Sequence, residues 1–414
     1  MIRQMMNMMS VHSGIPSALR LMKVNRKKKK GKIKIVFMCQ LTQVWSCIES
    51  IYEAAKDDKD VEAYILAVPN TWNTERVQND AYTFCKEKEY EVINAYNEKT
   101  RQFFDLKELD PDYVFIPRPY DEYLPELYRS KEISRFAKVC YVCYAYTAED
   151  GYILKTCFNK YFTTNCYFIF AENTSTYEYC VKNHPISSKF GVRKIEQMTY
   201  PRFDLLERWQ GYEPEHWKLS REYVHKRIIW APRWTTDESL GGTSFFKFKD
   251  FFFEFAKENP DIEIMIRPHP LAFDNFIKEG LMTTQDVIEY KEKCKAAKNL
   301  QLDERREYLD SFASADILVA DMSGVILDFL AMGKPIVFCS YGQELNSANE
   351  KLIEGFYVPH NVKELKDTLR ILVNSEDPKK NIREAITKEV LGECDGKSGT
   401  RIVEILKKDA KLGA

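Results

Sequence analysis

The stretch of residues 315–338 constrains the fold more than any other part of the chain. Residues 316–320 form a short apolar run typical of a strand that is buried on both faces. A helix-length segment follows, Gly333 ends it, and Pro335 begins a second apolar run at 336–338. The order of strand, helix and strand predicts a parallel βαβ unit.

Polar and small residues lie where the first of these strands passes into the helix. Asp321, Ser323 and Gly324 stand at this turn; Ser323 can cap the helix, and Gly324 removes a side chain from its first turn. A helix N-terminus at the carboxyl edge of a strand is a place where backbone N–H groups bind phosphate. The alternative is a plain α/β crossover without a ligand.

A second strand of this half ends in two basic side chains. Residues 261–266 read as a strand, and Arg267-Pro268-His269-Pro270 follows it directly. Arg267 offers a planar fork that suits phosphate, and His269 can donate a hydrogen bond or move a proton near neutral pH. Because both strand ends belong to one predicted α/β domain, we expect them to border one crevice.

The alternation of strands and helices predicts two doubly wound parallel sheets, one in each half of the chain. Strands are expected in the first half at 33–39, 63–68, 110–117, 138–144 and 167–170, and in the second half at 227–230, 261–266, 316–320 and 336–338. Ligands of such sheets bind beyond the carboxyl ends of the strands. The predicted segments are a basic, Met-rich leader at 1–32, an N-terminal acceptor-side Rossmann-like domain at 33–205, a linker at 206–226, a C-terminal nucleotide-donor-binding Rossmann-like domain at 227–390 and a C-terminal helix at 391–414 that packs back towards the N-terminal domain.

The charge of the chain is uneven. The net charge of −1 argues against a nucleic-acid binder, but Arg26-Lys27-Lys28-Lys29-Lys30 and Lys32 form a dense basic block after a Met-rich opening. Such a block can attach a protein to an anionic membrane surface, at about 1 kcal/mol per basic residue near the lipid. A solvated, disordered leader is the alternative.

Several protein classes are disfavoured by what the sequence lacks. The 11 cysteines are odd in number and follow no secretory signal, which favours a reduced, cytoplasmic setting; Cys140 and Cys143 are read as core. No run of about 18 apolar residues predicts a transmembrane helix. Neither G-x-G-x-x-G after the first strand nor G-x-x-x-x-G-K-[ST] is found, and no zinc motif is present, so we expect no metal and no cofactor.

The ordered motifs of the second half resemble the CDP-glycerol glycerophosphotransferase family, the teichoic-acid polymerases and primases of bacterial envelopes. The resemblance lies in Trp230-Ala231-Pro232-Arg233-Trp234, Arg267-Pro268-His269-Pro270, Ala315 to Gly324, Asp328-Phe329, Lys334 to Phe338, and Asp395-Gly396-Lys397 with Arg401. It implies a GT-B-like α/β fold in which two Rossmann-type domains face a central cleft and the C-terminal domain binds a CDP-activated donor as substrate.

The resemblance also implies residue roles. The resemblance assigns to His269 the family histidine's role at the donor phosphates, with Arg267 beside it. It assigns contacts with the donor to Asp321 and Ser323. In the reaction an acceptor hydroxyl attacks the phosphate next to glycerol and CMP leaves, so these groups would stabilise growing negative charge.

Further donor contacts are expected around these motifs. Arg233 can reach a phosphate, while Trp234 stacks on a base or packs an interface. Thr243 and Ser244 can bind phosphate beside Gly241-Gly242. Gly324 and Asp328 complete the turn motif, and Lys397 and Arg401 either reach the donor phosphates across the cleft or face solvent.

The chain departs from the family at two places. Gly324 stands where the family often has a second serine, and the family's N-terminal His-Gly segment has no counterpart. Residues 141–150 occupy that place, so Glu149 or Asp150 can be the base that deprotonates the acceptor, unless they form only a solvated turn.

Three functions are therefore compared. The first is a cytoplasmic transferase that can attach peripherally to the inner face of the membrane. It moves glycerol phosphate or a related polyol phosphate from a CDP-activated donor to a glycan or lipid-linked acceptor of a bacterial surface polymer. The second is a nucleotide-sugar glycosyltransferase of GT-B fold for capsule or lipopolysaccharide. The third is a non-catalytic nucleotide-binding scaffold subunit.

Overall fold

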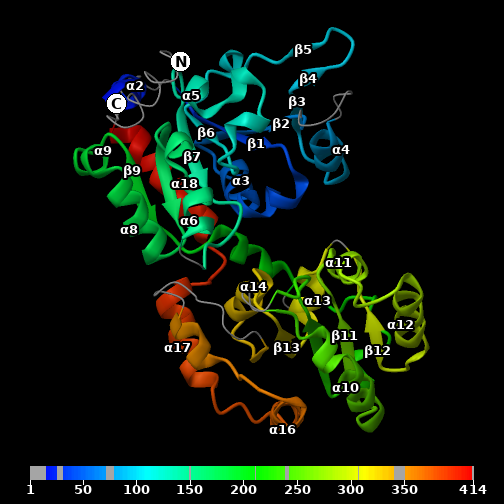
Figure 1. Cartoon of the computed structure of the whole chain (residues 1–414). Helices are drawn as coiled ribbons and strands as arrows, with labels where there is room; N and C mark the ends of the chain where they lie inside the picture. Colours follow the sequence, from blue (N-terminus) through cyan, green and yellow to red (C-terminus); the bar gives the residue numbers. More distant parts are fainter. Residues whose placement is uncertain are drawn as a thin grey trace. The chain divides into compact units, whose positions relative to one another are not determined.

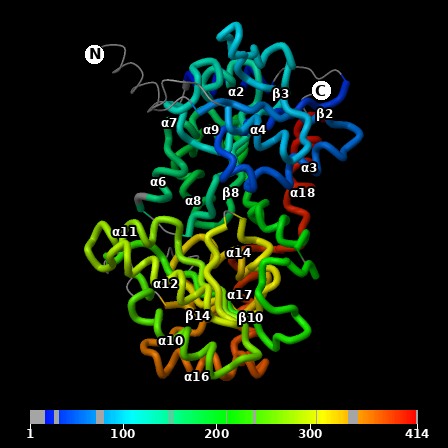
Figure 2. Tube along the Cα trace, turned by 90° about the vertical axis from the view of Figure 1, so that its right-hand side faces the viewer, coloured from blue at the N-terminus to red at the C-terminus, as the bar shows by residue number. Residues whose placement is uncertain are grey.

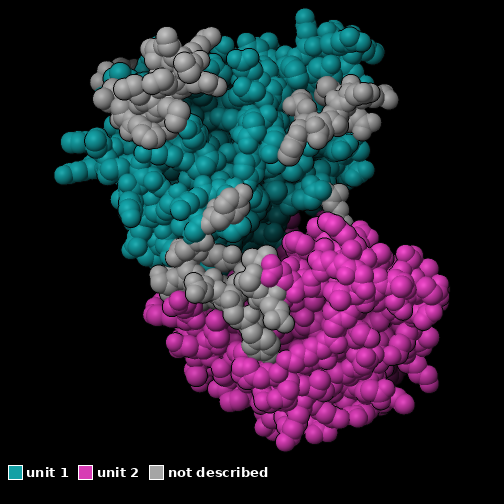
Figure 3. All heavy atoms as spheres, in the orientation of Figure 1, with its two compact units in different colours: residues 1–205, 393–414 teal, residues 206–392 magenta. Residues whose placement is uncertain are grey.

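The computed structural model divides the chain into two compact units. It describes residues 15–25, 31–70, 79–148, 151–209, 211–237, 242–305, 307–339 and 350–412. Unit 1 comprises residues 1–205 and 393–414, and unit 2 comprises residues 206–392 (Figure 3). Each unit has its own parallel sheet, which confirms the predicted fold class, a GT-B-like α/β architecture of two doubly wound Rossmann-type units.

Unit 1 is built on a seven-stranded parallel sheet in the order β3-β2-β1-β6-β7-β8-β9 (Figure 1). Its strands are β1 (Ile33–Cys39), β2 (Val61–Ala67), β3 (Val92–Asn94), β6 (Tyr113–Phe115), β7 (Lys138–Val142), β8 (Cys166–Ala171) and β9 (Lys194–Gln197). The chain leaves β1 towards β2 on one side and later adds β6 on the other. The topological switch point of this sheet therefore lies between β1 and β6.

Short helices accompany the unit 1 sheet, and a separate two-stranded hairpin follows β3 in the chain. The helices are α3 (Glu49–Lys56), α4 (Asp80–Glu87), α5 (Ser130–Ile133), α6 (Tyr152–Cys157), α7 (Lys160–Thr163), α8 (Thr174–Asn183) and α9 (Pro185–Lys189), and the hairpin is β4 (Tyr96–Asn97) with β5 (Gln102–Phe103). Cys140 and Cys143 are buried among the core residues, as the sequence predicts.

The C-terminal helix α18 (Ser398–Leu412) belongs to unit 1 and lies beside α3, as Figure 2 shows. Asp204 accepts hydrogen bonds from the backbone N–H groups of Ser398 and Gly399, at 3.1 and 2.8 Å, and so caps the start of this helix. A Cβ atom at Gly399 would lie 2.4 Å from the carbonyl oxygen of Ser50. Only glycine therefore permits this close approach of α18 to α3.

Part of the segment predicted as a leader is an ordered helix. Helix α2 (Ile15–Asn25) buries Leu21 and Val24, and Arg20 donates a hydrogen bond to Asn165 Oδ1 at 2.8 Å. Residues 1–14 and 26–30, which include most of the basic block, lie outside the described residues.

Unit 2 is built on a five-stranded parallel sheet in the order β12-β11-β10-β13-β14. Its strands are β10 (Lys226–Ala231), β11 (Ile262–Ile266), β12 (Leu300–Leu302), β13 (Ile317–Ala320) and β14 (Ile336–Phe338). The helices are α10 (Phe245–Glu258), α11 (Ala272–Lys278), α12 (Thr284–Ala296), α13 (Leu309–Ser314), α14 (Val325–Ala331), α16 (Val362–Val373) and α17 (Lys380–Leu391). The switch point of this sheet lies between β10 and β13.

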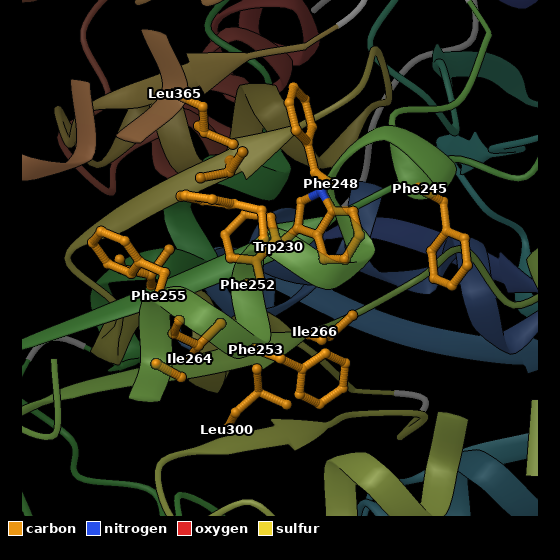
Figure 4. Packing of buried hydrophobic residues seen from close by; sticks show 14 of the residues in the cluster. Trp230, Phe245, Phe248, Phe252, Phe253, Phe255, Ile264, Ile266, Leu300 and Leu365 are labelled. Carbon is orange, nitrogen blue, oxygen red and sulfur yellow. The ribbon is translucent and has the colours of Figure 1, made fainter. Parts of the chain in front are cut away.

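An aromatic core fixes α10 on the unit 2 sheet. Trp230 of β10 stacks against Phe252 of α10, with ring centroids 4.5 Å apart, and Phe245 and Phe248 are also fully buried (Figure 4). This packing holds the loop between β10 and α10, which contains Arg233, Trp234, Thr243 and Ser244.

Residues 206–226, predicted to be a linker, are instead packed within unit 2. Glu213 accepts hydrogen bonds from the buried guanidinium of Arg227 at 2.6 and 2.9 Å, and Trp217 lies under the same guanidinium at 4.7 Å. The segment is rich in polar and aromatic side chains because it covers the edge of the sheet, not because it is a free connection.

Candidate functional site

Three neighbouring strand ends of unit 2 carry the predicted donor-binding residues. Arg233 follows β10, His269 follows β11, and Asp321 follows β13, and these three strands are adjacent and parallel. The carboxyl ends of parallel strands meet at one edge of a sheet. The backbone N–H of His269 donates to the Pro232 carbonyl at 3.0 Å, and the N–H of Asp321 donates to the Ala231 carbonyl at 3.3 Å. The three strand ends are thus joined directly.

The Asp321 carboxylate ties this edge together. It is fully buried, and its Oδ2 accepts hydrogen bonds from the backbone N–H groups of Arg233 and Ser244, both at 2.9 Å. Thr243 Oγ1 donates to the Arg233 carbonyl at 2.9 Å, and Trp230 Nε1 donates to Ser244 Oγ at 3.3 Å. Burial raises the pKa of Asp321, and the hydrogen bonds from Ser244 and Arg233 oppose that rise.

Two buried oxygen atoms at the same turn have no hydrogen-bond partner among the described residues. They are Oδ1 of Asp321 and Oγ of Ser323. Ser323 does not cap helix α14 as predicted, because Gly324 is the N-cap residue and no side chain caps this helix. Buried polar atoms normally have partners, so these two atoms mark a turn that is incomplete without a ligand or solvent.

His269 is exposed beside the indole of Trp234, with ring centroids 6.3 Å apart. Its Nδ1 accepts a hydrogen bond from the Leu271 N–H at 3.2 Å, which leaves Nε2 as the protonated nitrogen of the neutral ring. Desolvation, and then the charge of Arg233, lower the pKa of His269. The neutral imidazole therefore presents an Nε2–H donor at neutral pH.

Arg267 does not present a free fork to a phosphate. Its guanidinium donates to Asp303 Oδ2 at 2.6 Å and to the Arg305 carbonyl at 2.5 Å, and it lies over the ring of Tyr308. Burial lowers the pKa of Arg267 and the charge of Asp303 opposes this. Arg267 thus forms an ion pair within unit 2, and the role at the donor phosphates that we expected for it stays a prediction.

That ion pair belongs to a polar network that the motif analysis missed. Arg305 donates to Asp303 Oδ1 at 3.0 Å, to Asp310 Oδ2 at 3.0 Å and to Ser311 Oγ at 2.6 Å. Asp328, a predicted donor contact, accepts a 2.5 Å hydrogen bond from the Tyr308 hydroxyl. The available signal was the acid directly after a third strand, β12, which the sequence analysis did not recognise as a strand.

Four predicted residues belong to unit 1 by their position in the chain, and two of them are among the described residues. Arg401 forms an ion pair with Asp395, at 2.6 and 2.8 Å, and Lys397 is exposed. Glu149 and Asp150 lie outside the described residues. Their predicted roles stay predictions.

A buried carboxylate of unit 1 was missed by the sequence analysis. Glu172 follows β8 directly and is buried; its Oε1 accepts from the Thr147 N–H at 2.9 Å. Its Oε2 has no hydrogen-bond partner among the described residues, and desolvation raises its pKa to about 7. Its signal in the sequence is limited to an acid at the end of an apolar run.

No described residues form a group of three or more His, Cys, Asp or Glu side chains that could hold a metal ion. Within the same ranges, no helix combines the length and the apolar character needed to cross a bilayer.

Comparison with known proteins places this site in a family context. Residues 154–408, more than half of the chain, match the family model described as CDP-Glycerol:Poly(glycerophosphate) glycerophosphotransferase. A teichoic acid glycerol-phosphate transferase of Staphylococcus aureus (strain NCTC 8325 / PS 47) is 25% identical over 218 residues, which are 46% of this chain and 48% of that protein. The chain thus aligns with about half the length of this curated relative.

Solved structures share the fold over nearly the whole chain. The wall teichoic acid polymerase TagF superposes with a TM-score of 0.60 and 15% identity, covering 100% of this chain and 99% of that one. The UDP-GlcNAc 2-epimerase from Neisseria meningitidis, bound to UDP-GlcNAc, superposes with a TM-score of 0.58 and 12% identity, covering 91% and 100%. At these identities the likeness shows the fold alone.

Proposed function

We propose that this chain, which belongs to the CDP-glycerol:poly(glycerophosphate) glycerophosphotransferase family, transfers glycerol phosphate from CDP-glycerol to a hydroxyl group of a glycan or lipid-linked acceptor in bacterial surface-polymer synthesis. The observation that carries the proposal is the family match over residues 154–408, which includes all three strand ends of the unit 2 site. Here CDP-glycerol is the substrate that brings the activated phosphate.

The chemistry is a phosphoryl-group transfer. The acceptor oxygen forms a bond to the phosphorus next to glycerol, the bond from that phosphorus to the bridging oxygen breaks, and CMP leaves with the electron pair. Catalysis of such a reaction consists mainly of positioning and of stabilising the charge that grows on the leaving oxygen.

The donor-binding role is assigned to side chains at the strand ends of unit 2. In the proposal, neutral His269 donates its Nε2–H to a donor phosphate oxygen, and Arg233 supplies positive charge beside it. Trp234, 36% exposed, offers a flat surface next to His269. Ser323 Oγ and the open N-terminal turn of α14 complete the phosphate contacts, while Asp321 holds the loop in place.

The base that takes the acceptor proton is proposed to come from unit 1. Glu172 has a pKa of about 7, which suits a general base near neutral pH, and its Oε1 accepts a hydrogen bond from the N–H of Thr147. Glu149 and Asp150 remain the other two candidates for this role.

The test is release of CMP from CDP-glycerol by the purified protein in the presence of a lipid-linked acceptor. We expect His269→Ala to lower turnover about 100-fold. His360→Ala, which removes another exposed histidine of unit 2, serves as the matched control and should keep the parent rate. Binding of CDP-glycerol without release of CMP, whichever acceptor is present, would indicate a scaffold subunit instead. Turnover of UDP-sugars alone would indicate a glycosyltransferase.

Attachment to the inner face of the membrane is part of the proposal and rests on the basic residues 26–30 and Lys32. Deleting residues 1–32 would also remove the packed helix α2, so the sharper test replaces Lys27, Lys28, Lys29 and Lys30 with Gln. This variant should sediment less with anionic vesicles than the parent does, at unchanged thermal stability. Equal sedimentation of the two proteins would contradict attachment through this block.

A further inference from the structure

A hollow lies at the switch point of the unit 1 sheet, beyond the carboxyl ends of β1 and β6. It encloses about 290 Å³, open solvent included, and its polar wall consists of Gln40, Arg118 and Tyr120. Met38, Ile116 and Leu124 contribute apolar surface. The crevice at a switch point is where doubly wound sheets bind ligands.

Arg118 is held in this hollow by neutral groups only. Its Nη1 donates to Gln40 Oε1 at 3.0 Å, and its guanidinium carbon lies 5.3 and 5.5 Å from the ring centroids of Tyr120 and Tyr123. The amide of Gln40 is oriented by its own donation to the Tyr123 carbonyl at 2.7 Å. The Tyr120 hydroxyl is fixed by a 2.9 Å hydrogen bond to the Tyr144 hydroxyl. The cation is therefore positioned by a preformed frame.

No described carboxylate forms an ion pair with Arg118. Within the described residues, the guanidinium makes its hydrogen bond through Nη1, to Gln40 Oε1. Four other arginines of low exposure differ. Arg227 is paired with Glu213 and Glu263, Arg267 with Asp303, and Arg383 with Asp377. Arg193, which has no carboxylate partner, donates instead to three oxygens. Burial lowers the pKa of Arg118, and the nearby tyrosines oppose this. A bound anion would stabilise the charged guanidinium against the cost of its burial.

We infer that this hollow is a binding site for a small organophosphate, with Arg118 as the phosphate ligand and Gln40 and Tyr120 as hydrogen-bonding partners of the attached polyol. The guanidinium fork matches two phosphate oxygens, and Nε and Nη2 are the nitrogens left for them. The enclosed part of the hollow is water-sized and the rest opens to solvent, so phosphate oxygens would enter beside Arg118 while the short carbon chain, or the end of a longer polymer, extends outward.

The identity of the ligand rests on the proposed function. If the chain extends a glycerol-phosphate polymer, the acceptor end consists of a polyol next to a phosphodiester, which is the chemistry that Arg118 and its neighbours fit. Arg118 then determines acceptor affinity without contacting the donor. The existence of an organophosphate site does not itself depend on that reaction.

The experiment measures the binding of sn-glycerol 3-phosphate, inorganic phosphate, glycerate and glycerol to the full chain by calorimetry, and maps the site by phenylglyoxal labelling of arginines and peptide mass spectrometry. The variants are Arg118→Ala, Arg118→Lys, and Arg135→Ala as an exposed-arginine control from unit 1. Circular dichroism establishes that each variant is folded.

We expect glycerol 3-phosphate to protect Arg118 from labelling, and Arg118→Ala to weaken its binding at least 10-fold, whereas Arg135→Ala leaves it unchanged. Arg118→Lys should give an intermediate loss, because lysine keeps the charge but not the fork. Equal binding of inorganic phosphate with the same dependence on Arg118 would support the site with free phosphate as its ligand.

The proposal is overturned if Arg118→Ala binds glycerol 3-phosphate as the parent does, or if glycerate binds as tightly as glycerol 3-phosphate. Failure of the proposed function is visible separately, because it would appear as absent binding of CDP-glycerol to the parent. In the transfer assay, Arg118→Ala should raise the KM for the acceptor about 10-fold and leave the KM for CDP-glycerol unchanged.

Discussion

The two units place an arginine in the same local setting and use it differently. Arg118 follows β6 within Pro117-Arg118-Pro119, and Arg267 follows β11 in Arg267-Pro268-His269-Pro270. Arg267 is neutralised by Asp303, which lies 36 residues further along the chain, whereas Arg118 has a neutral amide and two tyrosine rings around it. A basic residue after a strand therefore becomes a binding group or a structural cation according to which acid the rest of the fold brings to it.

The largest expected difference is in stability. Arg267→Ala leaves the Asp303 carboxylate without its buried partner and should lower the free energy of unfolding by about 3 kcal/mol. Arg118→Ala breaks no ion pair with a described residue and should cost less than about 1 kcal/mol. Urea denaturation of both variants checks this. Equal losses in the free energy of unfolding would contradict the difference between the two arginines.

The buried carboxylates of the two units provide a second comparison. Glu172 after β8 has a pKa of about 7 against an ordinary value of 4.5, so the stability it contributes is present below pH 4.5 and lost as pH rises through about 7. Glu172→Gln does not titrate. Relative to this variant, the parent should lose about 3 kcal/mol between pH 4 and pH 8.

Parallel pH dependence of the parent and Glu172→Gln in urea denaturation would contradict the raised pKa of Glu172.

Asp321, the unit 2 counterpart after β13, also has a raised pKa, but its carboxylate additionally accepts hydrogen bonds from two backbone N–H groups. Asp321→Ala should therefore lower stability at every pH, because both N–H groups lose their acceptor.

The pH dependence of turnover distinguishes the unit 2 histidine from a general base. The pKa of His269 is lowered, and its neutral form is the proposed hydrogen-bond donor at the phosphate. A general base is lost on protonation, whereas a protonated His269 keeps its Nε2–H donor, so turnover should show no acidic limb that depends on His269, and His269→Ala should lower kcat about 100-fold at every pH. An acidic limb of the parent that disappears in the His269→Ala variant would contradict the donor role.

The smallest effect concerns two glycines at the starts of helices. A Cβ atom at Gly399 of α18 would meet the Ser50 carbonyl oxygen at 2.4 Å, while one at Gly324, before α14, would meet nothing within 4 Å. Gly399→Ala should therefore lower the free energy of unfolding by about 1–3 kcal/mol, and Gly324→Ala should be nearly neutral. Thermal unfolding of both variants decides this, and a neutral Gly399→Ala would contradict the close contact of α18 with α3.

The long strands of both sheets could be predicted because buried parallel strands are continuous apolar runs. Residues 33–39 and 336–338 match β1 and β14 to the residue, and the aromatic run after Ser244 forms α10. The strands β3, β9 and β12 were missed because they have only three or four residues and each includes a polar one, as in Lys194–Gln197.

The chemistry of the site was harder to predict than its location. Motif spacing placed Arg233, His269 and Asp321 at one sheet edge, but it could not show that Asp321 accepts two backbone N–H groups or that Arg267 is paired. These facts depend on side chains from distant segments. The Ser323 hydroxyl was expected to cap α14 because serine favours that position, whereas the backbone places Gly324 there.

The central claim is that the strand ends of β10, β11 and β13 in unit 2 bind a CDP-activated donor. Hydrogen exchange with mass spectrometry, with and without CDP-glycerol, tests it most directly. We predict slower exchange at residues 232–237, 269–272 and 321–326, with UDP-N-acetylglucosamine giving no such protection. Unchanged exchange at these three segments with saturating CDP-glycerol, or protection by the UDP-sugar alone, would contradict the claim.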